Sequence, residues 1–293
     1  MRLLVIGGGG MLGHKLWQLG RERMETWATV RSVTPAMAAL GLVDARTVSG
    51  IDVTRPGVLE PLLERVRPDA VVNCVGVVKQ LMTATDPIPA IQINSLYPHL
   101  LARACAAVGA RLVHISTDCV FGGTRGGYRE DDAADATDLY GRTKALGEVD
   151  AIGALTLRTS MIGRELSGAS GLVEWFLTQR RGAAAGYSAA IFSGFTTTEL
   201  SRIILDVIVQ SQDLRGLYHV SAAAIDKLSL LRLLDAAFSS NVTITCREQP
   251  VIDRSLDSER FRAATGYVPP SWPSMIEAMA ADATPYDAVR ALS

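Results

Sequence analysis

The amino-acid sequence predicts an α/β protein with a doubly wound parallel sheet and a smaller carboxyl-terminal domain. Three observations lead to this expectation. Short apolar segments in the first half show no polar alternation, which is typical of strands buried on both faces. Amphipathic helical segments lie between them, and such alternation with short connections favours right-handed crossovers and parallel strands. A glycine-rich turn follows the first apolar segment, as in sheets that bind nucleotides.

The elements of the first half follow from this pattern. The expected strands are Arg2–Ile6, Glu25–Val30, Ala70–Cys74, Arg111–Ser116 and Leu155–Arg158. Apolar residues within 58–66 recur at helical spacing and stop before Pro68, so a helix is expected there. A longer helix is expected over Ile91–Val108, with Gly109 as its C-cap.

The pattern becomes looser after about Thr159. Helices are expected over Thr198–Val209 and Leu228–Phe238, a strand over Gly216–Val220, and a stiff turn over 269–273 before a last helix. We therefore predict a first domain over residues 1–160 and a second over mainly 161–293, with segments near 190–212 returning to the first.

Composition excludes several classes of protein. The chain has 293 residues, of which 48% are hydrophobic, enough for a sizeable core. A net charge of −1 argues against nucleic acid or an anionic membrane as a partner. The four cysteines are far apart and form no C-x-x-C pair, so neither a metal site nor a disulfide framework is expected. Without a signal peptide or an apolar run of membrane length, we expect a cytoplasmic protein.

The glycine-rich turn is the first candidate binding motif. Gly7, Gly10 and Gly13 give the spacing G-x-x-G-x-x-G between the apolar run 3–6 and a helical segment. This arrangement suits the pyrophosphate of a dinucleotide, because backbone N–H groups approach the phosphates at a helix N-terminus. A merely flexible turn is the alternative, and the flanking strand and helix argue against it.

Tyr140 and Lys144 form the second motif. Four residues apart on a helix, they lie on one face. A free tyrosine has a pKa of about 10, and a neighbouring ammonium lowers it toward the range useful for proton transfer. A packed tyrosine beside a solvated lysine is the alternative structural interpretation.

A strand that runs into a polar turn carries the third motif. Ser116 and Thr117 lie at the carboxyl end of an expected strand, where such sheets bind ligands. The Thr117 hydroxyl could polarise a substrate carbonyl, or both hydroxyls could only satisfy turn backbone groups.

Taken together, the glycine spacing, Ser116-Thr117-Asp118, Tyr140 and Lys144 resemble the extended short-chain dehydrogenase/reductase family. Within it, the chain is similar to the sugar-nucleotide 4-keto reductases of the dTDP-4-dehydrorhamnose reductase type. Further matching stretches are 67–73, 157–160, 216–219 and 254–257. The resemblance implies a Rossmann sheet and a smaller substrate domain.

The resemblance also implies a catalytic set of Thr117, Tyr140 and Lys144. Hydride would pass from the nicotinamide to the C4 ketone of a nucleotide-linked 6-deoxy sugar, for surface polysaccharide or glycoside biosynthesis. Tyr140 would protonate the resulting oxygen, Thr117 would hold the carbonyl, and Lys144 would tune Tyr140 and bind the ribose.

Two sets of binding residues are expected. The cofactor contacts are Gly7, Gly10, Met11, Leu12, Gly13, Arg31, Ser32, Asp52, Val53, Cys74, Val75, Gly76, Ser116, Tyr140 and Lys144. The substrate contacts are Val78, Lys79, Asp118, Cys119, Trp175, Ser193 and Thr196. Lys79 would face a substrate phosphate or remain solvated, and Trp175 would stack on a nucleotide base or pack in the core.

Arg31 bears on the choice of cofactor. It ends the second expected strand, where an NAD enzyme usually carries an acidic residue for the ribose 2′-hydroxyl. A guanidinium suits a 2′-phosphate instead. We therefore predict NADP, with NAD as the alternative cofactor and an ordinary surface arginine as the alternative interpretation.

The chain also departs from its family. Cys119 occupies a position that is tyrosine in the rhamnose reductases, so the sugar can differ. Related dehydratases follow the catalytic threonine with Asp-Glu, whereas Asp118 is followed by Cys119 here. This favours reduction and leaves epimerisation open. A non-catalytic NADP-binding regulatory subunit is a further alternative, and a homodimer also stays open.

Overall fold

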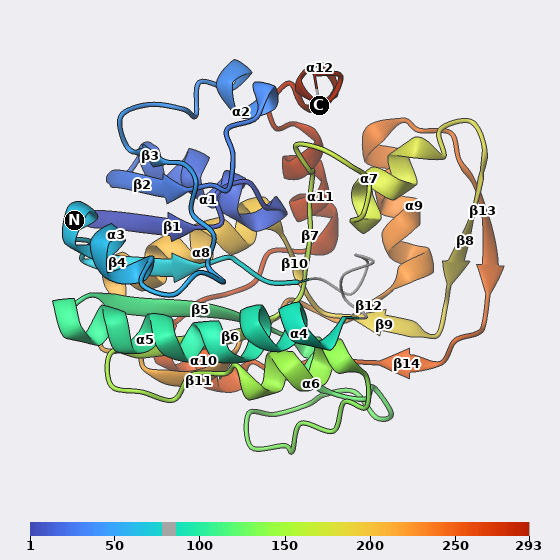
Figure 1. Cartoon of the computed structure of the whole chain (residues 1–293). Coiled ribbons are helices and arrows are strands. Elements are labelled where there is room, and N and C mark those ends of the chain that lie inside the picture. The colour runs from blue at the N-terminus through green and yellow to red at the C-terminus, as the bar shows by residue number, and fades with distance from the viewer. Residues whose placement is uncertain (78–85, 293) are drawn as a thin grey trace.

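The computed structural model of the chain describes residues 1–77 and 86–292, and its centre is a seven-stranded sheet (Figure 1). The strand order is β11-β6-β5-β4-β1-β2-β3, and every neighbouring pair is parallel. The strands are β1 (Arg2–Ile6), β2 (Glu25–Thr29), β3 (Thr47–Val48), β4 (Ala70–Asn73), β5 (Arg111–Thr117), β6 (Ala154–Thr159) and β11 (Gly216–His219). The predicted doubly wound fold is confirmed.

Helices cover both faces of this sheet. On one face lie α1 (Met11–Arg21) and α8 (Thr197–Gln210), and on the other lie α3 (Leu59–Val66) and α5 (Tyr97–Val108). The remaining helices are α2 (Pro35–Ala39), α4 (Pro87–Ala90), α6 (Leu139–Leu146), α7 (Leu172–Thr178), α9 (Lys227–Phe238), α10 (Glu259–Thr265), α11 (Trp272–Ala280) and α12 (Tyr286–Arg290). Among the residues described, no helix has the length and apolar content that crossing a bilayer requires.

The alternation of β1 shows why it is apolar at each position from Leu3 to Ile6. Leu3 and Val5 belong to the core on the side of α1 and α8, whereas Leu4 and Ile6 belong to the core on the side of α3 and α5. All four side chains are fully buried. A strand in the middle of a sheet that is covered on both faces needs apolar side chains at every position.

The helix predicted over 91–108 is two elements. A π-helical turn, η2 (Ile91–Leu96), precedes α5. Pro98 explains the change, because it has no N–H for the carbonyl of Asn94 and its ring crowds that carbonyl. The Asn94 carbonyl faces Gly147 at the end of α6, where a Cβ would lie only 1.8 Å from the oxygen. The turn therefore forms the surface on which α6 packs.

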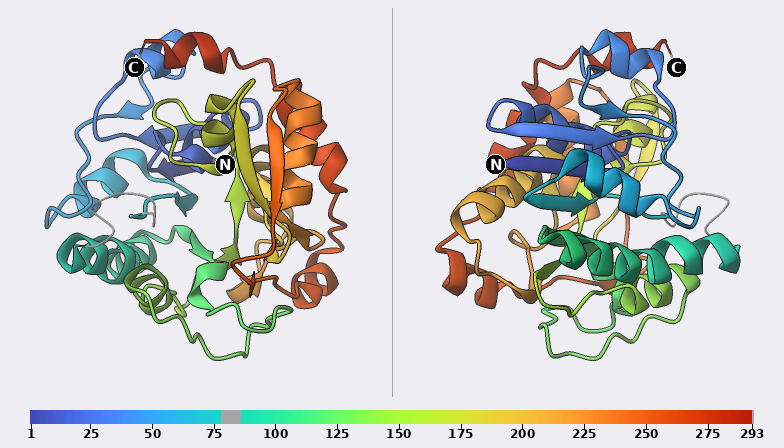
Figure 2. Two further views of the ribbon diagram at one scale, coloured as in Figure 1. Left: turned by 90° about the vertical axis from the view of Figure 1, so that its right-hand side faces the viewer. Right: turned by 60° about the vertical axis from the view of Figure 1, so that its left-hand side comes forward.

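The rest of the chain forms a lobe beyond the carboxyl ends of the central strands (Figures 1 and 2). Its small sheets pair β8 (Ala183–Tyr187) with β13 (Thr243–Arg247), and β9 (Ala190–Phe192) with β12 (Ile225–Asp226) and β14 (Ile252–Asp253). A third joins β7 (Met161–Ile162) to β10 (Phe195–Thr196). Two segments between β10 and β12 belong to the centre instead, because α8 packs on α1 and β11 pairs with β6. A domain boundary at residue 160 stays a prediction.

Candidate active site

The glycine loop between β1 and α1 is pressed tightly against its surroundings. Gly7 has φ +90°, a conformation that favours glycine, and its N–H donates to Thr29 Oγ1 at 3.2 Å. A Cβ on Gly13 would lie 2.0 Å from the Gly7 oxygen, so only glycine lets α1 approach the loop. Gly10 is the N-cap of α1 and offers no side-chain cap, and the first turn holds no acidic residue. The N–H groups of this turn are therefore suited to an anion.

Other expected cofactor residues also lie around this loop. The segment Cys74–Gly76 follows β4 and lies beside the loop, since a Cβ on Gly7 would come within 2.8 Å of Val75. Leu12 is buried in the core, so only its backbone can serve a ligand. Met11 is half-buried and faces Gly171 from the second half of the chain.

Arg31 and Ser32 lie after β2, and both are exposed. Asp52 lies nearby on the same edge, and Val53 packs against the core beneath it. Hydrogen bonds from Thr54 lower the pKa of Asp52, and the charge of Arg31 adds to this effect. The exposed Arg31 guanidinium thus lies beyond the carboxyl end of β2, where it can bind an anionic ligand.

The three expected catalytic residues meet at the carboxyl end of β5. Thr117 ends this strand, and Tyr140 and Lys144 lie on α6. Lys144 Nζ is buried and donates to the Ile115 carbonyl at 2.8 Å. A hydrogen bond with Thr117 acts on the Tyr140 hydroxyl. Close packing of α6 permits this, because a Cβ on Gly141 would lie 2.2 Å from the Cys119 carbonyl.

The pKa of Tyr140 differs from the sequence expectation. Burial raises it, the neighbouring Cys119 adds to the rise, and the Thr117 hydrogen bond only partly offsets them. The expected lowering by Lys144 is not among the main influences on this pKa, and desolvation of the phenolate sets its direction. Burial also lowers the pKa of Lys144 to about 8, against the opposing charge of Glu148. Tyr140 therefore keeps its proton at neutral pH and can donate it.

Asp118 and Cys119 complete the turn after β5. The Thr117 hydroxyl donates to Asp118 Oδ1 at 3.1 Å and accepts from the Cys119 N–H at 3.1 Å. Burial raises the pKa of Asp118, and burial followed by the charge of Asp118 raises that of Cys119 to about 12. Cys119 is therefore a neutral thiol beside Thr117 and Tyr140.

Ser116 points away from this set. Its hydroxyl donates to Glu148 at 2.7 Å, and Glu148 also receives both Arg158 Nε and a terminal nitrogen of Arg158 at 2.7 Å. Ser116 thus connects β5 to a buried ion pair behind the site. A cofactor role for its side chain stays a prediction.

Among the expected substrate residues of the second half, two are buried and one is exposed. Trp175 is exposed on α7. Ser193 is buried and accepts from the Leu256 N–H at 2.9 Å, and Thr196 caps α8 by accepting from Glu199. Their hydroxyls thus serve the fold, and their substrate roles stay predictions. Val78 and Lys79 lie outside the described residues.

Sequence reasoning missed Asn94. This buried side chain accepts from the Val77 N–H at 2.9 Å and donates to the Val77 carbonyl at 3.1 Å. It also donates to Thr143 Oγ1 on α6 at 3.3 Å. Asn94 thus ties the loop after β4 to the helix of Tyr140. Pro98 was the feature of the sequence that could have indicated an irregular helix at Asn94, because it lies in the first turn of α5.

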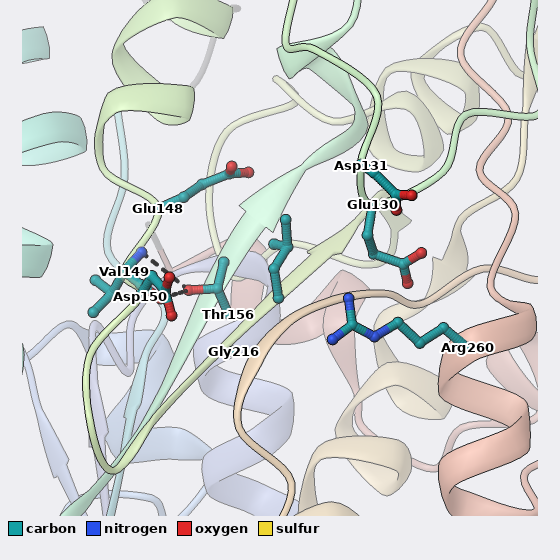
Figure 3. A pocket seen from close by; sticks show the side chains of 9 residues that line it. Glu130, Asp131, Glu148, Val149, Asp150, Thr156, Gly216 and Arg260 are labelled. Atoms are coloured by element: carbon teal, nitrogen blue, oxygen red, sulfur yellow. Dashed lines mark hydrogen bonds between the residues drawn. The ribbon is translucent and has the colours of Figure 1, made fainter.

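A surface hollow of about 470 Å³ lies beside β6 and β11 and is separate from this site. Its lining residues are Glu130, Asp131, Glu148, Val149, Asp150, Thr156, Gly216, Leu217 and Arg260. Figure 3 shows Glu130, Asp131 and Arg260 across from Glu148 and Asp150. None of the expected binding residues is among them, so the hollow does not replace the site at β5.

The sheet order, the glycine loop and the joined Thr117, Tyr140 and Lys144 define an α/β protein of the extended short-chain dehydrogenase/reductase class. Residues 1–284 match the family described as RmlD substrate binding domain, and the chain belongs to this family.

Two curated relatives and one solved structure are examples of proteins similar to this chain. The dTDP-4-dehydrorhamnose reductase of Mycobacterium tuberculosis (strain CDC 1551 / Oshkosh) is 35% identical over 50% of this chain and 44% of its own length. Methionine adenosyltransferase 2 subunit beta of Mus musculus is 30% identical over 56% and 48%. The chain thus spans about half the length of the curated relatives it matches. The structure of dTDP-4-dehydrorhamnose reductase from Bacillus anthracis in complex with NADP is 21% identical, covers 95% and 98%, and has a TM-score of 0.79.

Replacement of Asn94 by alanine tests its structural role. Asn94→Ala leaves the buried N–H and carbonyl of Val77 without their partner, so we expect the free energy of unfolding to fall by roughly 2–4 kcal/mol. Urea denaturation followed by circular dichroism measures this. Gln92→Ala, an exposed change on the same π-helical turn, serves as the control and should stay near the wild type. Equal stabilities of the two variants would contradict the assignment.

Proposed function

We propose that the chain is an NADPH-dependent reductase of the 4-keto group of a nucleotide-linked 6-deoxy sugar, of the dTDP-4-dehydrorhamnose reductase type. One observation carries the proposal: Thr117, Tyr140 and buried Lys144 meet at the end of β5. The names of the curated relatives and the NADP in the Bacillus anthracis structure support it. The product would serve surface polysaccharide or glycoside biosynthesis in the cytoplasm.

The residues present fit a dinucleotide. The first turn of α1 offers uncapped N–H groups to a pyrophosphate, and exposed Arg31 lies where a ribose 2′-phosphate would need a cation. The segment Cys74–Gly76 borders the same loop. When bound, the nicotinamide supplies a hydride.

The chain itself supplies the proton and the electrostatics. Tyr140 holds its proton at neutral pH and donates it to the carbonyl oxygen as that oxygen gains charge. The Thr117 hydroxyl, which donates to Asp118 in this structure, polarises the same oxygen. The Lys144 ammonium, held by the Ile115 carbonyl, stabilises the phenolate that Tyr140 leaves.

Simple reduction is favoured over dehydration at this site. A neutral thiol with a pKa of about 12 stands at Cys119, where a dehydratase would carry a second carboxylate. Incubation with NADPH and a nucleotide 4-keto-6-deoxy sugar separates the alternatives. A reductase consumes one NADPH per sugar, whereas an epimerase or dehydratase recycles its cofactor.

A regulatory subunit is the second candidate, because methionine adenosyltransferase 2 subunit beta is among the relatives. Such a subunit needs no proton donor, so the assembled Thr117, Tyr140 and Lys144 argue for catalysis. The activity of a Tyr140 variant distinguishes a reductase from a regulatory subunit.

The Tyr140→Phe variant removes the proposed proton donor and keeps the ring. We expect kcat to fall about 100-fold or more, because general acid catalysis contributes roughly 10²–10⁴-fold. NADPH affinity, measured by fluorescence titration, should stay within about twofold because the proton acts only in the chemical step. Unchanged turnover in this variant would rule out the mechanism.

The choice between NADPH and NADH should depend on Arg31. Replacing it by aspartate puts a negative charge where the 2′-phosphate would bind, so the NADPH/NADH ratio of kcat/KM should fall about 10- to 100-fold. Arg46→Asp makes the same change of charge at another exposed arginine and should leave the ratio near that of the wild type. A ratio that responds equally to both variants would show general electrostatics instead.

The dependence of kcat/KM on pH should reflect the ionisation of Lys144. Burial lowers its pKa to about 8, and the protonated form is the active one, so kcat/KM should decline as pH rises through about 8. Glu148 raises this pKa, so Glu148→Gln should move the descending limb to lower pH. Steady-state rates from pH 6 to pH 10 measure the effect, and an unmoved limb in the variant would contradict this origin.

A further inference from the structure

A buried polar contact joins the end of the chain to the glycine loop. His14 on α1 is fully buried, and its Nδ1 lies 2.9 Å from the Gly10 carbonyl oxygen. Its Nε2 lies 2.9 Å from the hydroxyl of Tyr286, the first residue of α12. The two rings meet edge to face with centroids 5.7 Å apart. His14 therefore links the N-cap of α1 to Tyr286, which lies 272 positions after His14 in the chain.

The direction of these hydrogen bonds follows from their partners. The Gly10 carbonyl can only accept, so His14 Nδ1 carries the proton. Burial lowers the pKa of His14 to about 4, so the ring is neutral and Nε2 has no proton at neutral pH. Nε2 therefore accepts from the Tyr286 hydroxyl. The tyrosine thus fixes the tautomer that His14 needs to bind Gly10.

The neighbouring residue of α1 binds the same segment. Lys15 is almost fully buried, and its ammonium donates to Asp282 and to Gln18. Asp282 in turn accepts from the N–H and hydroxyl of Thr284. A buried ammonium is tolerated only when paired, so this contact fixes residues 282–284 on α1.

The other end of the segment is tied to the region of α7. Arg164 donates to Glu174 and to Asp287, both at 2.6 Å. Arg290 lies 3.3 Å from Glu174 and donates to the Glu165 carbonyl at 3.0 Å. Residues 282–290 therefore connect α1 with the loop and helix that follow β7.

We propose that His14 and Tyr286 are positioning residues for the dinucleotide, through which residues 282–290 hold the first turn of α1 in its anion-binding conformation. The inference rests on the proposed function, because it assumes that this turn receives the pyrophosphate. Four consecutive glycines, 7–10, leave the turn few constraints of its own. Fixing the Gly10 carbonyl from outside lowers the entropy that binding would otherwise cost.

The test is the dinucleotide affinity of the Tyr286→Phe variant of the full chain. Loss of the hydroxyl frees His14 to change its tautomer, so we expect the Kd for NADPH to rise about 3- to 10-fold, the effect of one hydrogen bond. The Kd for 2′-AMP, which has no pyrophosphate, should stay within about twofold of the wild type. His14→Ala should raise the Kd for NADPH further. If the His14→Ala variant does not fold, the Tyr286→Phe variant alone still tests the inference.

Tyr267→Phe is the matched control. It removes a half-buried hydroxyl that donates to Glu199 at 2.8 Å, away from the glycine loop. We expect a similar loss of thermal stability in both variants and no change of the NADPH Kd in Tyr267→Phe. An NADPH Kd that is unchanged in Tyr286→Phe, or equally raised in Tyr267→Phe, overturns the inference and leaves the proposed function intact. Absence of NADPH and NADH binding by the wild-type chain overturns both.

Discussion

The hydrogen bond from Lys144 to the Ile115 carbonyl is the contact on which the candidate site depends. It places a buried ammonium directly against β5, two residues before Thr117, and so fixes α6 at the end of the sheet. Burying this charge is unfavourable, as its lowered pKa shows. The Ile115 carbonyl and the charge of Glu148 offset part of that cost. Tyr140 lies one helical turn before Lys144, so the same bond sets its place beside Thr117.

Polar groups from the neighbouring π-helical turn also hold α6 in place. Asn94 donates to Thr143 Oγ1, and Ser95 donates to the Thr143 carbonyl at 2.8 Å. Both come from the π-helical turn that Pro98 imposes, and Gly147 allows the close packing. The site is thus assembled by backbone constraints of glycine and proline as much as by charge.

The central sheet was predictable, because strands buried on both faces are largely apolar, and the run from Leu3 to Ile6 shows this directly. The positions of Thr117 at a strand end and of Tyr140 and Lys144 on one helix were also predictable, since both depend on local patterns. Their catalytic roles stay a prediction. Asn94 could not be found in this way, because its partners come from two other segments of the chain. For Ser193 and Thr196, local resemblance suggested ligand contacts, whereas the fold uses their hydroxyls for Leu256 and for a helix cap. The pKa of Tyr140 likewise depends on its burial, which no local pattern reveals.

The glycine loop shows how local sequence and contacts from distant segments act together. Its sequence gives it the freedom to approach a phosphate, but the same freedom would make an ordered binding conformation unfavourable. The fold removes that freedom from three sides: Thr29 binds the Gly7 and Gly8 N–H groups, Gly13 packs against the loop, and His14 holds Gly10. Tyr286, far along the chain, orients His14 by donating to its Nε2. The glycine loop is therefore held in part by a segment near the other end of the sequence.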